Sequence, residues 1–239
     1  YVTPITESLG FTRGAYSITH SLRSVTSVIL NLSFGFLVGI FGMHKMMSIG
    51  MLFAAGAMFL FSIAAQLPLF YVGGILLGAA FSFASTAVIS SLINNWFAKH
   101  RGTILGLIFA GSGVGGFLFN MLVGNWIADM GWRQSYLISS MIMLCAMVPI
   151  LLLVRNHPAD KGLVAYGLEN SKEKTTKTAY WQGSSAKEAF HQPYFYLTVL
   201  LIFLIGLITN PVVLSAPAHL TDSGFDVHFA AGISGMVYL

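Results

Sequence analysis

Long apolar runs separated by short polar breaks dominate the chain. A helix needs about 20 apolar residues to cross a hydrocarbon core of roughly 30 Å. Only helices satisfy their own backbone hydrogen bonds over such lengths in lipid. The pattern therefore predicts six complete transmembrane helices, and a seventh that begins near residue 227 and reaches Leu239. The expected ranges of the six are 14–41, 46–66, 69–95, 103–128, 134–154 and 194–217.

The breaks between the first five runs are short, so consecutive helices are expected to run antiparallel. These breaks lie at residues 44–45, 67–68, 98–101 and 130–133. A longer polar segment follows at 155–193 and is expected to be a solvated linker. Three parts are therefore predicted: a helix bundle over 1–154, the linker over 155–193, and the start of a second bundle over 194–239.

Basic residues fall almost entirely in alternate breaks, which indicates a sidedness. Nine of them share one side of the predicted membrane, whereas Arg13 and Arg133 lie on the other. The positive-inside rule places the nine in the cytoplasm. The chain is thus expected to be a multi-pass protein of the inner cell membrane with a cytoplasmic linker. The nine are Lys45, Lys99, Arg101, Arg155, Lys161, Lys172, Lys174, Lys177 and Lys187.

The composition supports the membrane class. The chain is 56% hydrophobic and only 8% charged, with a mean hydropathy of +0.77, whereas soluble domains carry roughly 25% charged residues. The net charge is +4, but the basic residues do not cluster with aromatic residues on one face, so no nucleic-acid partner is expected. The single cysteine, Cys145, excludes an internal disulfide and a Cys-based metal site. No cofactor or metal is expected.

Two groups of residues resemble known transporters. The segments 4–11 and 217–225 resemble each other. This likeness is similar to the parallel repeats that relate the two halves of major facilitator transporters. The segment 94–106, from Asn-Asn-Trp-Phe to Ile-Leu-Gly, resembles helices four to five of such a protein. The glycine-rich stretch 110–116 and the triplet 131–133, Gly-Trp-Arg, extend this resemblance to helix six.

The segment 158–163, Pro-Ala-Asp-Lys-Gly-Leu, is similar to the linker opening of the oxalate/formate antiporter and monocarboxylate transporter branch. The resemblance covers essentially the whole chain and implies an all-α major facilitator fold, with helices two to seven and part of helix eight. It also implies a monomeric secondary transporter that moves a small mono- or dicarboxylate by alternating access. Uniport, proton coupling and exchange for a counter-anion stay open, and the alternatives are an exporter of amphiphilic drugs and a non-transporting membrane sensor.

The chain also departs from the family pattern. Gly35, Gly42 and Lys45 fit the loop after helix two, but Gly39 and Ile40 stand where an Asp and an Arg are expected. The acid–base latch that the family forms there is therefore in doubt. Similarly, Gly74 stands four residues before Gly78, at the position of an Arg that other branches associate with proton antiport.

Arg23 is the main candidate for binding a substrate. It lies about ten residues, or ~15 Å, into the first run, which places it near the middle of the bilayer. All Asp and Glu lie outside the predicted helices, and an unpaired cation there costs at least roughly 2.5–3.5 kcal/mol. A guanidinium binds a carboxylate bidentately. The hypothesis is that Arg23 binds the substrate carboxylate; the alternative is a structural pair with an acid elsewhere or with helix carbonyls.

Other polar residues extend this candidate site. Tyr16, His20, Arg23, Ser27 and Asn31 recur at steps of three and four, so they share one helix face. A stripe of that polarity is unfavourable against lipid and is expected to face protein or water. His20 is either a site residue or a packing residue. The predicted substrate-binding residues are Arg23, His20, Ser27, Asn31, Thr86 and Asn120.

Glycines and one Asn-Pro pair are candidates for helix packing and gating. Glycines in the run 103–128 let two helices approach closely, and no strand precedes them, so they do not form a dinucleotide-binding motif. Asn210-Pro211 frees a carbonyl, which forms either a gate or a simple kink. No catalytic set of residues is found, so no enzyme is expected. The predicted packing and gating residues are Gly35, Gly42, Lys45, Gly111, Gly113, Gly116, Asn210 and Pro211.

The sidedness gives a first prediction. In intact cells that express the full-length protein, Lys172→Cys should resist membrane-impermeant thiol reagents, whereas Met130→Cys should react, because the lysine-rich side faces the cytoplasm. Cys145 should be replaced by Ala in both variants so that it cannot contribute labelling. The opposite labelling pattern would invert the topology.

Overall fold

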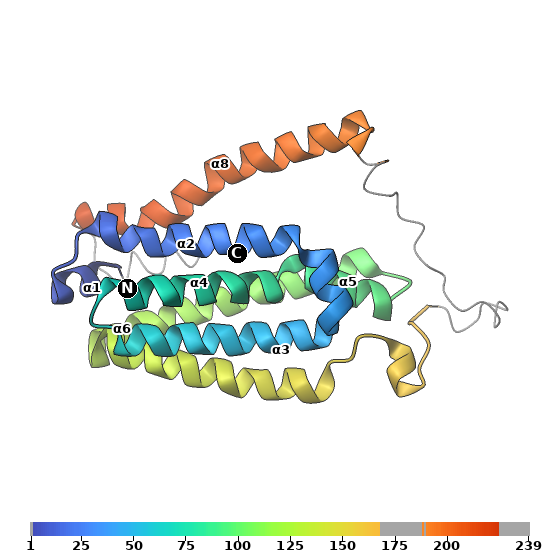
Figure 1. Cartoon of the computed structure of the whole chain (residues 1–239), viewed down its shortest axis with the longest axis horizontal. Coiled ribbons are helices and arrows are strands. Elements are labelled where there is room, and N and C mark those ends of the chain that lie inside the picture. The colour runs from blue at the N-terminus through green and yellow to red at the C-terminus, as the bar shows by residue number, and fades with distance from the viewer. Residues whose placement is uncertain (1, 168–187, 189, 225–239) are drawn as a thin grey trace. The chain divides into compact units, whose positions relative to one another are not determined.

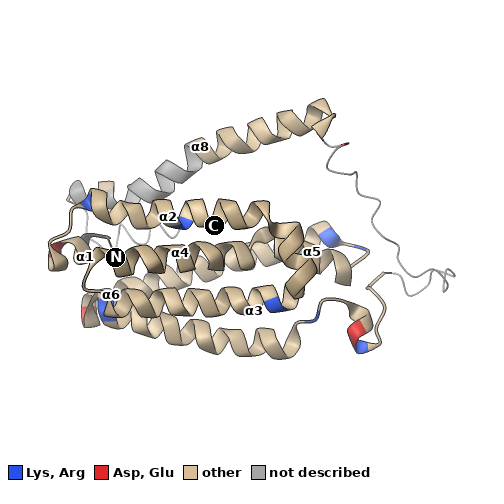
Figure 2. Cartoon of the chain, viewed as in Figure 1, with Lys and Arg blue, Asp and Glu red and all other residues tan. Residues whose placement is uncertain are grey.

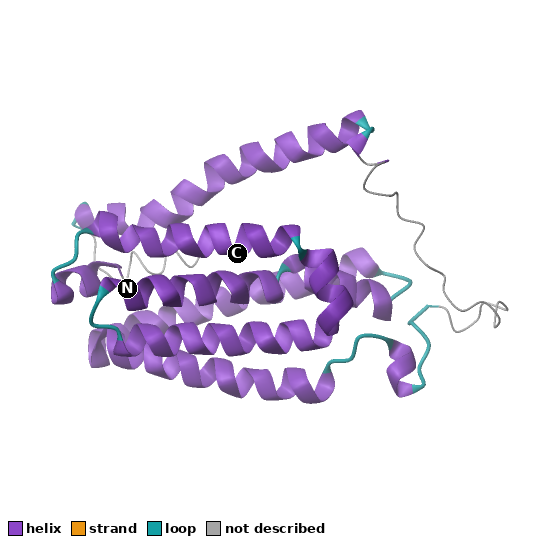
Figure 3. Cartoon of the chain, viewed as in Figure 1, coloured by secondary structure: helices purple, strands orange, loops and turns teal. Residues whose placement is uncertain are grey.

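The computed structural model describes residues 2–167, 188 and 190–224. Within this part of the chain the secondary structure is helical, apart from turns and one isolated bridge between Phe97 and Tyr166 (Figure 3). Three helical stretches are long and apolar enough to cross a membrane: Phe34–Ile63, Leu67–Trp96 and Arg101–Leu153. Figure 2 shows that the charged residues lie mainly at helix ends and in connections. The expected all-α class is confirmed.

The chain divides into two compact units. The first contains Tyr1–Phe109 and Asn125–Glu169, and the second contains Ala110–Gly124 and Asn170–Leu239. The division at 154 and 193 expected from the sequence stays a prediction.

Among the described residues, the first unit contains seven helical elements, one of which also includes residues of the second unit. Thr12 caps the start of the helix Arg13–Leu32, because its hydroxyl accepts a hydrogen bond from the Ala15 amide at 3.2 Å. Pro68 lies in the first turn of the helix Leu67–Phe83, where the backbone N–H that proline lacks would have no partner within the helix. The elements are α1 (Val2–Leu9), α2 (Arg13–Leu32), α3 (Phe34–Ile63), α4 (Leu67–Phe83), α5 (Thr86–Trp96), α6 (Arg101–Leu153) and the 3₁₀ turn η1 (Pro158–Lys161). Figure 1 labels α1 to α6.

Two glycines with positive φ interrupt the long helices. Gly42 breaks α3 with φ 70° and ψ 158°, and Gly131 breaks α6 with φ 81° and ψ 165°. A residue with a Cβ is strained in this conformation, so glycine is required at both points. The break at Gly131 falls within the connection expected at 130–133. The connection expected at His44 and Lys45 is corrected, because both residues lie in helix and the chain breaks at Gly42.

Two expected helices are each divided in the structure. The run 14–41 is interrupted at Ser33, which separates α2 from α3, and the run 69–95 is interrupted at Ala84 and Ser85, which separate α4 from α5. The Ser33 hydroxyl donates to the Ile29 carbonyl at 3.3 Å, a local bond that competes with the helical pattern. Hydropathy measures the length of an apolar run and does not detect such breaks.

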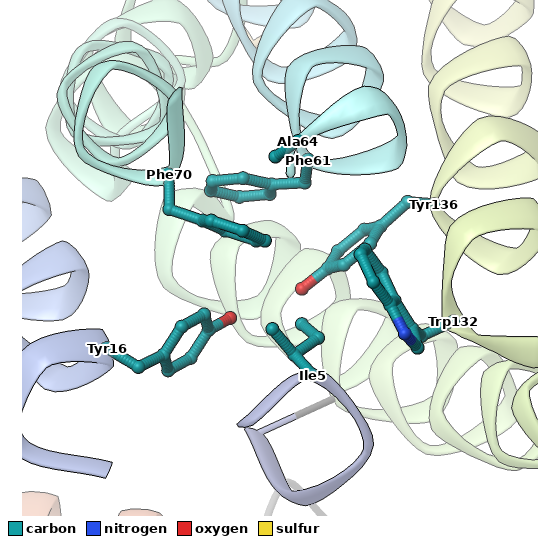
Figure 4. Packing of buried hydrophobic residues seen from close by; sticks show 7 residues of the cluster. All are labelled: Ile5, Tyr16, Phe61, Ala64, Phe70, Trp132 and Tyr136. Atoms are coloured by element: carbon teal, nitrogen blue, oxygen red, sulfur yellow. The ribbon is translucent and has the colours of Figure 1, made fainter. Parts of the chain in front are cut away.

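Two hydrophobic clusters hold the first unit together. In the first cluster, the Phe70 ring packs edge-on against the Tyr16 ring, with 5.5 Å between ring centres, and stacks on the Phe61 ring, with 5.7 Å between ring centres. Figure 4 shows these residues. Aromatic pairs of this geometry add about 0.5–1.5 kcal/mol each beyond the area they bury. The members of the first cluster are Ile5, Tyr16, Phe61, Ala64, Phe70, Trp132 and Tyr136. Those of the second are Met43, Met46, Phe83 and Val88.

Helices α2 and α4 approach each other closely at two glycines. A Cβ added to Gly74 would lie 2.6 Å from the Thr19 carbonyl oxygen, and one added to Gly78 would collide with the Arg23 carbonyl oxygen. The four-residue spacing of these glycines is the small-xxx-small pattern that lets membrane helices meet backbone to backbone. Gly74, noted in the sequence for the Arg it lacks, is therefore a packing residue.

The second unit contains α8 (Pro193–Asp222) and residues 110–124 of α6. Within the α6 segment Gly113 is buried, and a Cβ added to Gly111 would meet nothing within 4 Å. Asn210 and Pro211 belong to α8, but their side chains lie outside the described residues. The packing and gating roles predicted for Gly111, Gly113, Gly116, Asn210 and Pro211 stay predictions.

The close approach of α2 and α4 gives a second prediction. Gly78→Ala should lower the melting temperature of the detergent-purified protein, because overpacking a tight contact costs about 1–3 kcal/mol. The matched control is Gly39→Ala, since Gly39 is exposed and helical and a Cβ there meets nothing within 4 Å. Equal melting temperatures for the two variants would show that the glycine contact is not needed.

Candidate functional site

Arg23 lies halfway along α2, beside the point where α4 comes closest. Its side chain is half-buried, and its guanidinium carbon lies 5.0 Å from the centre of the Phe81 ring of α4. Phe81 is exposed, and a cation over an aromatic face at an exposed site is stabilised by about 0.5–1 kcal/mol. Phe81 was not predicted as a site residue. The signal that points to it is its helical spacing from Gly74 and Gly78, at steps of four and three.

Ser27 and Asn31 form a hydrogen-bonded group farther along the same face. The Asn31 amide nitrogen donates to Ser27 Oγ at 3.3 Å, and Ser82 Oγ of α4 donates to Asn31 Oδ1 at 3.1 Å. Ser82 is buried, Ser27 is half-buried and Asn31 is exposed. The structure therefore brings three predicted residues, Arg23, Ser27 and Asn31, onto one face of α2.

His20 connects this face to the aromatic cluster. Its ring lies edge-on to Tyr16 at 5.8 Å, and it is half-buried. Tyr16 is itself buried and is hydrogen-bonded through its side chain to Tyr136. The contact with Tyr16 supports the packing alternative for His20, and its place one turn before Arg23 keeps a binding role as a prediction.

The remaining predicted residues do not join this group. Thr86 is the exposed first residue of α5, and Lys45 is exposed in α3 after Gly42. Asn120 belongs to the second unit, where its amide donates to the Gly116 carbonyl at 2.9 Å. Across the described residues, no set of three or more His, Cys, Asp or Glu is placed to hold a metal ion.

A second polar arrangement, here called the Asn156 clamp, lies at the end of the first unit that holds the Gly42 break. The Asn156 side-chain oxygen accepts from the His44 amide at 2.7 Å, and its backbone oxygen accepts from Asn95 Nδ2 at 3.0 Å. A Cβ at Gly42 would lie 2.6 Å from Asn156 Nδ2. The clamp therefore needs glycine at this break for space as well as for its backbone conformation.

Neighbouring bonds extend the Asn156 clamp. Trp96 Nε1 donates to the Arg155 carbonyl at 2.8 Å. Tyr166 and the end of α5 exchange two backbone hydrogen bonds, from the Tyr166 amide to the Trp96 carbonyl at 2.9 Å and from the Ala98 amide to the Tyr166 carbonyl at 2.8 Å. Residues 155–166 are thus attached to α3 and α5 by neutral groups. Gly39 and Ile40 stand where the family has an acid and a base, and none of these hydrogen bonds is a charged pair that replaces them.

Apolar helices of membrane-crossing length, close glycine packing and a half-buried arginine midway along α2 together indicate a polytopic membrane protein in which α2 carries a polar face. The model of the Major Facilitator Superfamily matches residues 1–239, and the chain belongs to this family. The named relatives of this chain are transporters.

Several curated proteins resemble this chain. An uncharacterized MFS-type transporter, YcxA of Bacillus subtilis strain 168, is 22% identical over 238 residues, covering 99% of this chain and 55% of its own length. The riboflavin transporter RibJ of Trypanosoma brucei brucei is 34% identical over 47 residues, covering 20% of this chain and 9% of its own length. The MFS-type transporter pynF of Aspergillus niger is 30% identical over 89 residues, covering 37% of this chain and 20% of its own length. The chain thus spans about half the length of the relative that it matches from end to end.

The Asn156 clamp gives a third prediction. Asn156→Ala should lower the melting temperature of the detergent-purified protein, because an amide left without its partner costs about 1–3 kcal/mol. It should also speed proteolysis of the segment after residue 155. Asn125→Ala is the matched control, since Asn125 is an exposed helical asparagine. If the two variants behave alike, the clamp does not hold the segment.

Proposed function

We propose that the protein is a secondary transporter that carries a small organic anion across the inner cell membrane by alternating access. Arg23 binds the carboxylate of the substrate. The observation that supports this role is the position of Arg23, which is half-buried midway along the apolar helices α2 and α4 and lies next to the ring of Phe81. The proposal follows the resemblance to the oxalate/formate antiporter and monocarboxylate transporter branch.

The contact with Phe81 suits anion binding. The five N–H donors of a guanidinium lie in its plane, whereas an aromatic ring interacts with a cation through its face. The ring therefore limits the motion of Arg23 without using the donors that a carboxylate needs. A structural arginine would instead be expected to spend these donors on an acid or on helix carbonyls, as Arg133 does on the Ser62 carbonyl at 3.0 Å.

Alternating access needs two bundles that move around the site. The bundles of the proposal are residues 1–154 and 194–239, joined by a cytoplasmic linker over 155–193, and the transporter works as a monomer. A coupled proton or counter-anion completes the cycle. A flat aromatic cargo such as riboflavin has weaker support, because the resemblance to the riboflavin transporter covers 20% of this chain.

The fourth prediction tests Arg23. Arg23→Lys keeps the charge but loses the bidentate geometry, and Arg23→Gln loses both. Losing a buried charged partner costs about 2–5 kcal/mol, or roughly 30- to several thousand-fold in affinity. Anion affinity should therefore fall from wild type to Lys to Gln. The measurement is uptake of labelled oxalate, formate, pyruvate, lactate and glutarate into proteoliposomes that contain the full-length protein.

Arg13→Gln is the matched control, because Arg13 is an exposed arginine at the start of the same helix. It should transport like the wild type. Equal anion transport by the wild type and Arg23→Gln would exclude the binding role. Loss of folded protein in Arg23→Gln, with normal transport in Arg23→Lys, would favour the structural alternative.

A further inference from the structure

The hydrogen bonds between Ser27, Asn31 and Ser82 leave unused donors on the same face as Arg23. Ser27 Oγ accepts from Asn31, so its own O–H remains available among the bonds of the described residues. The Asn31 amide nitrogen has two hydrogens and spends one on Ser27. By contrast, the Asn31 carbonyl oxygen already accepts from Ser82. The group therefore offers mainly donors to a ligand.

Ser82 positions this group. It is buried in α4 and holds the Asn31 carbonyl oxygen toward that helix, so the amide nitrogen points away along α2. The backbone contact of α4 with α2 at Gly78 sets the distance between the two helices at this level. The bond from Ser82 thus orients the Asn31 amide, whose nitrogen is directed toward Ser27.

The spacing of the donors along α2 is regular. Ser27 lies one turn beyond Arg23, about 6 Å along the axis, and Asn31 lies a second turn beyond, about 12 Å along it. Steps of four residues keep all three on one side of the helix. The Arg23 guanidinium is therefore followed, one and two helical turns away, by the neutral donors of Ser27 and Asn31. This arrangement fits a ligand that has a hydrogen-bond acceptor at each end.

We propose that Ser27 and Asn31 bind a second carboxylate, so that the site selects an extended dicarboxylate over a monocarboxylate. This inference rests on the proposed role of Arg23 as the first anchor. A dicarboxylate with a short methylene chain, such as glutarate, spans the two anchors. Oxalate does not, because its carboxylates are joined directly, and lactate has no second carboxylate to place.

The test compares glutarate with lactate and oxalate on the purified full-length protein in proteoliposomes. Asn31→Asp keeps the side-chain size and the acceptor for Ser82, but it replaces the donor by a negative charge. Ser27→Ala removes a single hydroxyl. The matched control is Ser24→Ala, since Ser24 is an exposed serine of the same helix whose hydroxyl donates to the His20 carbonyl at 3.0 Å.

The wild type should bind glutarate at least about tenfold more tightly than lactate or oxalate, because hydrogen bonds to a charged group account for roughly ten- to a hundredfold in affinity. Asn31→Asp and Ser27→Ala should each lose much of this preference, because glutarate affinity should fall by a larger factor than lactate affinity. Ser24→Ala should behave as the wild type. Size-exclusion profiles identify any variant that does not fold. If either Ser27→Ala or Asn31→Asp fails to fold, the comparison rests on the variant that does.

Two results would overturn the second anchor. One is a wild type that binds lactate or oxalate as tightly as glutarate. The other is an equal loss of glutarate and lactate binding in Ser27→Ala and Asn31→Asp. In both cases a dependence of anion binding on Arg23 would leave the proposed function intact. Binding of anions that is the same in the wild type and in Arg23→Gln would instead overturn the proposed function itself.

Discussion

The contact between the backbones of α2 and α4 is the interaction on which the candidate site depends. Helices in lipid gain little from hiding apolar surface from each other, so close van der Waals packing must hold them together. Gly74 and Gly78 allow this approach, and any side chain at either position would meet the carbonyl groups of Thr19 and Arg23. The same approach brings Phe81 under the Arg23 guanidinium and Ser82 to the Asn31 amide.

The two ends of the first unit are stabilised by different means. One end contains an aromatic cluster in which Phe70 contacts Tyr16, Phe61 and Trp132. The other end carries the Asn156 clamp, built from amide, indole and backbone groups. Hydrogen bonds between neutral groups are much less sensitive to salt than exposed ion pairs. An end held in this way does not require the acid–base pair that the family usually places near Gly39 and Ile40.

Part of the site could be predicted from residue spacing. The periodicity placed Arg23, Ser27 and Asn31 on one polar face, and all three lie on that face of α2. Phe81 was missed, because an aromatic residue in an apolar run does not stand out until the contact at Gly74 and Gly78, from which it is spaced by helical steps, is known. The division of the run 14–41 at Ser33 was also missed, since a serine in an apolar helix often leaves the backbone continuous. His20, Thr86 and Asn120 keep their predicted roles only as hypotheses.

The sequence by itself determined the class of the protein and the character of each segment. This is because a bilayer forces long apolar runs into helices that satisfy their own backbone hydrogen bonds. Only the tertiary structure decided which residues meet, such as Asn156 with His44, which are 112 positions apart. Such contacts depend on how each helix is rotated and how closely it packs against its neighbour. Neither quantity is encoded in the local pattern, so the partners of Arg23 and Asn31 became visible only in the folded chain.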